Sequence, residues 1–448
     1  MQTAIRGYTL AEPEWTSPVQ NVAVKESVGL RISFLLAALG LFLYLTVSDP
    51  LLAMLGIPYT APSGSFIYKL HPATYLCLLA LPIAFFFSSR SWRTRHRLRQ
   101  NVSYCLYGLV IVMLMVYTTY RYGTSGSAFL IDTLLMPAVI GLTLNFYPDK
   151  WRAFLFKMIL VICCVNALLG IVEAMTQWRL EEYSVAGGTL IIENEFRATA
   201  LMGHPLTNAM VMSLATFGML VWCRHWMSRI LVAFLALITL LAFGGRTAFL
   251  LTSLLLSLCA AYAIIQSARK GRIRAWHLLV CLITFGLLCA ILGGAILYLD
   301  LGARIFEGLV WDESADIRRR SMMAFDFLSI EQLLLGVSPG EIAEIILRIN
   351  IRNPIEIIEN TWIVLTLQFG VISLVMLIAS YGFLLLQLAR KAPPLMKVGL
   401  LSFLILTSSN NALSVKTMVL VFTVSVVMTS ESFVQLHDRR RIRYRSRR

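Results

Sequence analysis

Long apolar segments separated by short polar stretches recur along most of the chain. About 20 consecutive apolar residues are enough for a helix to cross the hydrocarbon core of a bilayer. The pattern predicts about twelve such helices. They are expected at residues 29–48, 71–88, 102–119, 129–146, 153–175, 205–223, 229–243, 247–266, 277–298, 361–387, 396–411 and 415–433. We therefore expect an all-α polytopic membrane protein.

Composition agrees with this class. Charged residues make up 14% of the chain and the mean hydropathy is +0.74, whereas soluble domains carry about 25% charged residues. A net charge of +15 would suggest nucleic acid as the partner of a soluble protein. In a membrane protein, topology explains the charge, because cytoplasmic loops collect Lys and Arg. We expect no nucleic-acid partner.

The basic residues predict the orientation of the chain. Of the 39 Lys and Arg, 27 lie in segments that alternate along the predicted spans and so share one face, which the positive-inside rule makes cytoplasmic. Both termini then lie inside, where the basic tail can meet membrane lipids. The expected regions are a cytoplasmic segment (1–28), nine spans (29–298), a large outer loop (299–360), three spans (361–433) and the basic tail (434–448).

The large outer loop is amphipathic. It holds 11 of the 24 acidic residues, together with apolar runs such as 333–335. We expect short helices on the outer surface that cap a cavity. Asp132 and Glu173 are the few acidic residues within spans, and both are expected near the outer ends.

The first of three candidate clusters runs from Arg197 to Asn208. Pro205 suits the first turn of a helix, which places His204 near the N-cap. Asn208 follows His204 by four residues, so the two share a helix face. His and Asn are also ordinary capping residues, and an Arg can simply reach a lipid headgroup. The pattern as a whole favours function, whereas His204 alone favours a cap.

The second cluster is Gly244-Gly245-Arg246. A double glycine allows a tight turn, which would hold Arg246 at the outer boundary. An interfacial arginine that extends to water explains the residue equally well. However, its position opposes the positive-inside trend, and charges at the membrane are often functional.

The third cluster lies in the outer loop and at its end. Arg318, Arg319 and Arg320 need anionic partners, either nearby acidic residues or a ligand. Glu359 and Asn360 open the next span, where the helix dipole favours a carboxylate in any case. All three clusters are expected at the outer N-terminal ends of helices that run inward. Together they predict an anion site on the outer face, suited to a lipid pyrophosphate. No phosphate-binding loop or metal-binding motif is evident, so we expect no cofactor and no metal.

The order of these residues resembles the O-antigen ligase/polymerase family. The resemblance covers roughly residues 160–430 and rests on Arg197, Gly203-His-Pro, Asn208, Gly245-Arg246, Arg318, Leu335-Gly336 and Asn360. It implies a GT-C-like fold with a large periplasmic loop before the third-last helix, in a bacterial inner membrane. It also implies metal-independent, inverting transfer of undecaprenyl-pyrophosphate-linked glycan.

The resemblance further implies residue roles. Arg246 and Arg318 would stabilise the leaving pyrophosphate, and Glu359 would act as general base. Arg197, His204, Asn208, Arg319, Arg320 and Asn360 would bind substrate. Ligases of this family typically have His where this chain has Glu359, which favours a polymerase. A ligase acting on an acceptor such as lipid A core, and a flippase for the lipid-linked sugar, remain alternatives. A chain-length regulator and a separate flippase are the implied partners.

Overall fold

The computed structural model describes residues 27–59, 65–88, 95–124, 126–180, 184–185, 189–190, 196–269, 286, 319–352, 358 and 360–445. The predicted span at 277–298, except residue 286, lies outside the described residues. Arg318 and Glu359 lie outside them as well.

Each remaining predicted span lies on a helix. The bounds are α1 (Val28–Thr46), α3 (Pro72–Phe87), α4 (Arg95–Tyr122), α5, η3 and α6 in succession (Ser127–Phe129, Leu130–Leu135, Met136–Asn145), α7 (Asp149–Thr176), α8 (Pro205–Trp222), α9 (Trp226–Ala242), α10 (Arg246–Arg269), α16 (Thr361–Lys391), α17 (Pro394–Ser408) and α18 (Val419–Arg445). Within the described residues, eight helices are long and apolar enough to cross a bilayer, and α3, α9 and α17 are shorter apolar helices. The chain is therefore a helical, polytopic membrane protein.

Short elements connect these helices. They are α2 (Asp49–Met54), η1 (Phe66–Lys69), η4 (Ala200–Met202), η5 (Met322–Phe327), α14 (Ile330–Leu335) and α15 (Pro339–Arg352). The described strands are two residues each, β1 (Ser184–Val185) and β2 (Thr189–Leu190), paired antiparallel with Ser184 opposite Leu190. The expectation of an all-α chain is confirmed apart from this small hairpin.

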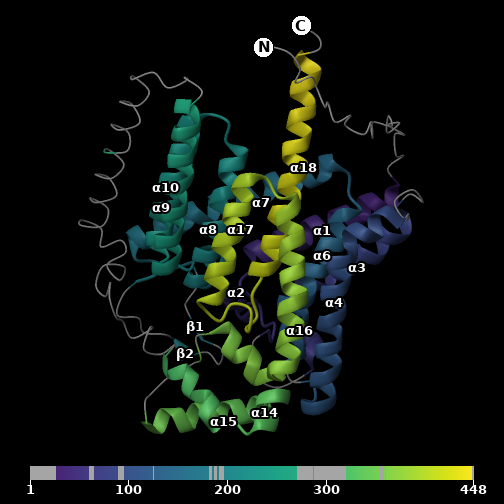
Figure 1. Ribbon diagram of the computed structural model, residues 1–448, viewed down its shortest axis with the longest axis vertical. Helices are drawn as coiled ribbons and strands as arrows, with labels where there is room; N and C mark the ends of the chain where they lie inside the picture. Colours follow the sequence, from purple (N-terminus) through teal and green to yellow (C-terminus); the bar gives the residue numbers. More distant parts are fainter. Residues whose placement is uncertain are drawn as a thin grey trace, which may run out of the picture.

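The long helices pack side by side, and α18 occupies the middle of the bundle (Figure 1). Its buried side chains include a row of hydroxyls, Thr423, Ser425, Thr429 and Ser430, whose Oγ atoms donate to backbone carbonyls of the same helix. Such bonds satisfy polar groups where water is absent. Three helices are also joined by hydroxyls, since Ser213 on α8 lies 2.7 Å from both Thr252 on α10 and Ser402 on α17.

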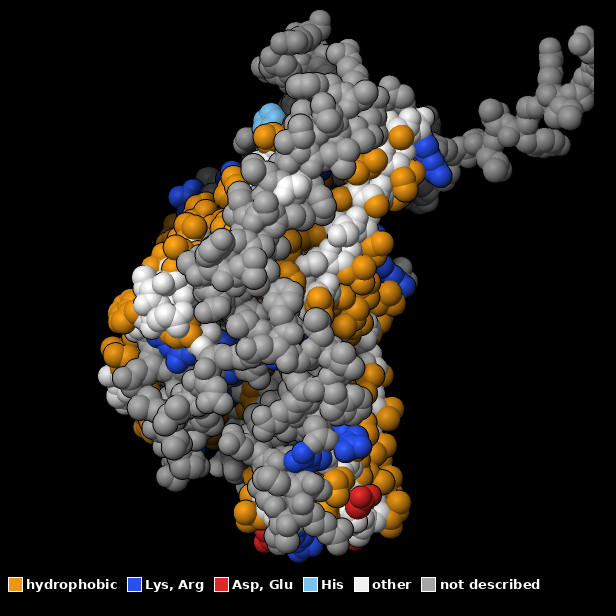
Figure 2. Space-filling view, turned by 90° about the vertical axis from the view of Figure 1, so that its left-hand side faces the viewer, with side chains coloured by type: hydrophobic (Ala, Val, Ile, Leu, Met, Phe, Trp, Pro, Cys, Tyr) orange, Lys and Arg blue, Asp and Glu red, His pale blue; other side chains and the backbone are white. Residues whose placement is uncertain are grey.

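The two ends of the molecule are formed by different elements. The C-terminal end of α18 extends past the other helices, and α14 and α15 gather at the opposite end (Figure 1). Figure 2 shows hydrophobic side chains along the described edges of this view, and both acidic and basic side chains at its lower end. Exposed acidic residues of α14 and α15 include Glu331 and Glu344.

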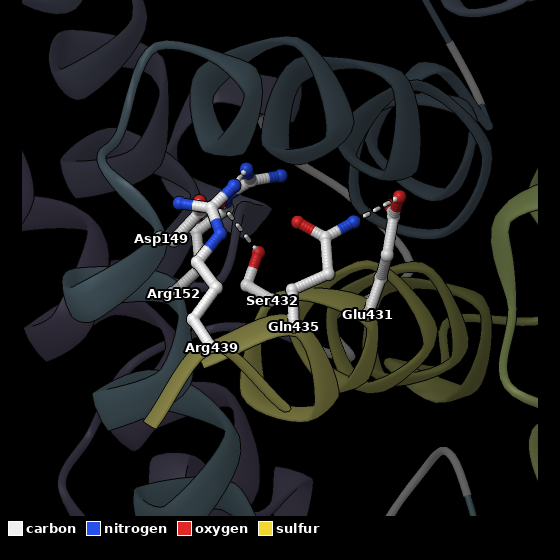
Figure 3. A network of polar contacts seen from close by, with 6 residues as sticks. All are labelled: Asp149, Arg152, Glu431, Ser432, Gln435 and Arg439. Carbon is white, nitrogen blue, oxygen red and sulfur yellow. Dashed lines mark hydrogen bonds and ion pairs between the residues drawn. The ribbon is translucent and has the colours of Figure 1, made fainter. Parts of the chain in front are cut away.

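A polar network joins the first turn of α7 to the C-terminal half of α18 (Figure 3). Asp149, in the first turn of α7, accepts from Arg152 at 2.6 Å and from Ser432 at 3.3 Å, and Arg439 lies 3.8 Å away. An acidic residue is favoured there by the helix dipole. Gln435 donates to Glu431 one turn earlier on α18.

The expected short helices of the outer loop are confirmed for its described part. Ser329 and Gln332 form a capping box at the start of α14. Along α15, Ile345 and Ile349 are buried while Glu344 and Arg348 are exposed. The buried face joins an apolar cluster with Ala324, Val337, Ile363 and Leu367. The α14–α15 unit, which we call the cap, therefore rests on the beginning of α16.

The span predicted at 361–387 lies on helix α16, which is bent rather than continuous. Helix α16 breaks at Gly370, where φ is 75° and ψ is 165°. Figure 1 shows the two arms meeting at a sharp bend beside α14. There the Val337 N–H donates to Leu367 O at 2.7 Å. The short arm (361–369) starts at the α17–α18 loop and ends at the cap, and the long arm (371–391) then runs along α4.

Candidate functional site

The loop before α8 meets the turn between α9 and α10. The Ala198 N–H donates to Ala242 O at 3.0 Å. Gly244 has φ +63, and a Cβ built there would lie 2.9 Å from Cγ and Cδ of Arg197. The Arg197 stem therefore lies directly across the glycine turn that precedes Arg246. A Cβ on Gly245 would lie 2.6 Å from the Ala209 methyl, so α8 and α10 begin close together.

His204 caps α8, as its position before Pro205 predicted. Its Nδ1 accepts from the Leu206 N–H at 3.2 Å. Burial, and then the Arg197 charge, lower the pKa of His204 to about 4. The ring is thus neutral at physiological pH, with Nδ1 accepting and the proton on Nε2. His204 is a hydrogen-bond donor at the edge of this site rather than a base.

Asn208 lies behind the loop. It is fully buried, and its Nδ2 donates to Thr199 O at 2.5 Å and His204 O at 3.1 Å. Its Oδ1 accepts from Asn166 on α7 at 2.8 Å, and Asn166 Oδ1 accepts from the Leu201 N–H. Both carboxamides hold the loop in shape, so the geometry gives Asn208 a structural task.

The third predicted helix start is joined to the first two through the α17–α18 loop. Asn360 caps the short arm of α16, accepting from the Trp362 and Ile363 N–H groups at 2.9 and 3.2 Å. The Thr361 N–H donates to Asn410 O at 2.8 Å, and Asn410 Nδ2 contacts Met210 on α8. That this start lies on the outer face stays a prediction. Asn360 and Asn410 already satisfy its first amides.

The remaining predicted residues are placed as follows. Arg319 is exposed and Arg320 half-buried. Both precede η5, where Ala324 packs with Ile363 of the short arm. These two arginines thus belong to the cap side of the molecule. Arg318 and Glu359 lie outside the described residues, so their predicted roles stay predictions.

A second polar cluster, the lysine cluster, lies among η1, the start of α3, η3, the residues after α2 and the α17–α18 loop. Lys416 donates to Tyr59 O at 2.5 Å and Lys69 O at 2.9 Å, and it lies over the Tyr59 ring. Asp132 accepts from the His71 N–H at 3.1 Å and the Thr74 hydroxyl at 2.5 Å. Burial lowers the pKa of Lys416, against the opposing effect of Asp132 and Asp49. These bonds fasten the α1–α3 connection to the bundle.

The arrangement suits a bound anion. Arg197 and Arg246 are half-buried and belong to segments that touch. Arg246 is the first residue of α10, and the Arg197 stem lies against the turn just before it, where the helix dipole adds partial positive charge. Guanidinium groups match the geometry of phosphate oxygens and bind them more strongly than neutral donors do. A site of this composition favours an anion over a neutral or cationic ligand.

Sequence reasoning noticed Glu173 only as an acidic residue in a span, and it missed Asn166. Both are fully buried on α7 and bind the loop that carries Arg197. The available signal was a pair of polar residues seven positions apart in an apolar helix, which places them on one face. The chain matches no protein-family model, no curated protein and no solved structure.

Proposed function

We propose that the chain is a polymerase that joins undecaprenyl-pyrophosphate-linked oligosaccharide repeat units into exopolysaccharide or O-antigen. In this proposal, the chain spans a bacterial inner membrane about twelve times in a GT-C-like arrangement. Both termini are cytoplasmic and the cap is periplasmic. The asymmetry of the basic residues supports this orientation, since α18 ends in an arginine-rich segment.

The observation that carries the proposal is the contact between Arg197 and the Gly244 turn. It brings together two arginine-bearing segments that are far apart in the chain. Both lie at one end of α8, where a lipid pyrophosphate would present its oxygens. Two arginine-bearing segments that meet over a close-packed glycine favour a shared anion over separate anchoring at the interface.

The proposed reaction is an inverting glycosyl transfer. A hydroxyl of the acceptor repeat unit attacks the anomeric carbon of the donor glycan. The new glycosidic C–O bond forms as the bond from that carbon to the pyrophosphate oxygen breaks. Undecaprenyl pyrophosphate leaves with the electron pair, and Arg197, Arg246 and the His204 Nε2–H offset its growing charge. Arg318 is proposed to assist them.

The acceptor proton passes to a base, which we propose is Glu359. Arg319, Arg320 and Asn360 are proposed to contact the glycan from the cap side. Asn208 supports this assembly by holding the Arg197 loop. A flippase would supply the donor from the cytoplasmic face, and a chain-length regulator would act on the product.

The test is gene deletion followed by complementation and size analysis of surface and lipid-linked glycan. Arg246→Ala and Arg197→Ala should insert normally but leave only single repeat units on the carrier. Arg348→Ala is the matched control, because that exposed residue pairs only weakly with Glu344 at 3.8 Å. It should restore polymer.

Other outcomes identify other functions. Full-length polymer that accumulates on the carrier in the deletion strain would mean a ligase. Repeat units trapped on the cytoplasmic face would mean a flippase. Normal polymer from the Arg246→Ala and Arg197→Ala variants would refute the anion site.

A further inference from the structure

A buried carboxylate lies at the end of α7, beside the candidate site. Glu173 is fully buried and sits in the last turn of the helix, which ends at Thr176. The helix dipole disfavours negative charge there, and burial adds a further cost. The chain places a carboxylate at this point despite both effects.

Three backbone amides satisfy this carboxylate. Oε2 accepts from the Thr199 N–H at 2.8 Å and the Ala200 N–H at 2.9 Å. Oε1 accepts from the Leu180 N–H at 2.9 Å. One side chain therefore binds both ends of the connection between α7 and α8. Hydrogen bonds to an ionised acceptor are stronger than neutral ones.

The bonds hold an unfavourable backbone conformation. Ala200 has φ +41, a left-handed conformation that costs a residue with a Cβ free energy. Such a conformation persists only where its surroundings enforce it. The bond from its N–H to Glu173 is part of that enforcement.

Arg197 lies immediately before the bound amides. Its own carbonyl accepts from Arg179 Nε at 3.1 Å, and the next residue is bonded to Ala242. The backbone that follows Arg197 is thus fixed, at Ala198 by α9 and at Thr199 and Ala200 by Glu173. A fixed backbone limits the positions that the Arg197 guanidinium can occupy. Binding of an anion therefore costs less conformational entropy.

We propose that Glu173 is a positioning residue that holds Arg197 in place to bind a diphosphate. The inference rests on the proposed function, since it takes the Arg197 site to be a pyrophosphate site. Glu173 acts through the loop and does not touch the substrate. The ligand class is an isoprenyl diphosphate, whose head carries the charge that Arg197 recognises.

The probe is undecaprenyl pyrophosphate, with undecaprenol as the uncharged comparison, bound to the purified full-length protein in nanodiscs. Glu173→Gln keeps the volume of the side chain but removes its charge. It also replaces one acceptor oxygen with a carboxamide NH2 group, which cannot accept a hydrogen bond from the backbone amides. We expect about a ten- to hundredfold loss of diphosphate affinity, by analogy with the loss of metal affinity when residues that orient metal ligands are removed. Undecaprenol binding should stay unchanged.

The matched control is Asp132→Asn. It makes the same carboxylate-to-amide change in another buried residue, 2% exposed, that bonds to residues of α3. Its diphosphate affinity should equal that of the unmodified protein. Hydrogen exchange should rise at Thr199 and Ala200 in Glu173→Gln and not in the control.

A double-mutant cycle separates positioning from general damage. If Glu173 acts through Arg197, then Glu173→Gln combined with Arg197→Ala binds no more weakly than Arg197→Ala alone. Additive losses would overturn the proposal. Glu173→Gln that binds normally while Arg197→Ala binds weakly would also overturn it and leave the pyrophosphate site standing. Normal binding by Arg197→Ala would refute both.

A second variant covers the case in which Glu173→Gln folds poorly. Glycine adopts the left-handed conformation without strain, so Ala200→Gly relieves the need for the carboxylate. Glu173→Gln with Ala200→Gly should recover folding and part of the diphosphate affinity. Recovery of folding with no recovery of exchange protection or affinity would contradict the proposed role.

Discussion

Replacing Gly370 with alanine tests the bend in α16. The residue has φ 75° and ψ 165°, a region that glycine alone occupies readily. Forcing another residue there costs about 1–3 kcal/mol. A Cβ would also lie 2.2 Å from Leu334 O and 2.6 Å from the Gly336 nitrogen. These are backbone atoms, so relief requires the cap to move, at about 1–3 kcal/mol for overpacking.

The two effects together predict that Gly370→Ala lowers the free energy of unfolding by about 2–6 kcal/mol. The assay is equilibrium unfolding in mixed micelles, with hydrogen exchange of α14 and α15 as the local measurement. Gly382→Ala is the control, because a Cβ at that position on the same helix meets no atom within 4 Å. If the two variants have equal free energies of unfolding and equal hydrogen-exchange protection in α14 and α15, this explanation of the bend is refuted.

Three further predictions concern the packing of the bundle and the cap. Ser213→Ala removes the hydroxyl that joins three helices and should cost about 0.6–1.7 kcal/mol in mixed micelles, while Ser257→Ala, exposed on α10, should cost nothing measurable. The Ser338 N–H holds the pKa of Glu341 below its usual range. The ionised Glu341 carboxylate therefore stabilises the cap fully above the unfolded pKa of about 4.3, and this stabilisation is lost as pH falls through the lower pKa of the folded state. Hydrogen exchange in the cap should rise over the same pH range, and Glu341→Gln should abolish this pH dependence. Lys416→Met leaves two carbonyls without their charged donor and should destabilise by about 1.5–3 kcal/mol, unlike the exposed Lys397→Met; equal melting temperatures would contradict this.

The sequence predicted the helices well because their signal is local. The segments that became α7 and α18 are long and predominantly apolar, so length and hydropathy identify them. The cap of α8 was also predictable, since Pro205 favours the first turn and places His204 before it. These inferences needed no knowledge of what packs against what.

The bend in α16 was not predictable in this way. Glycine inside an apolar run is common in membrane helices, so Gly370 gave no warning. The break depends on α14, since Gly336 and Gly370 approach each other backbone to backbone. That contact joins segments whose pairing leaves no trace in the local pattern.

The candidate site was partly predictable. Its arginines stood out because they oppose the positive-inside trend, and the structure brings two of the three predicted segments into contact. The task of Glu173 did not stand out, because an acidic residue near a span end looks the same whether it faces water or three buried amides. Only its burial and its partners separate the two cases.

The contact of Arg197 with Gly244 also constrains how related sequences can vary. A side chain at 244 would occupy the space of the Arg197 stem, whose Cγ and Cδ lie 2.9 Å from a Cβ built there. Relatives that keep arginine at 197 should therefore keep glycine at 244. Where 244 acquires a side chain, position 197 should become small, and the proposed diphosphate site should be lost with it. Positions 197 and 244 should therefore covary, and the residues found there should distinguish related sequences that keep the proposed anion site from those that have lost it.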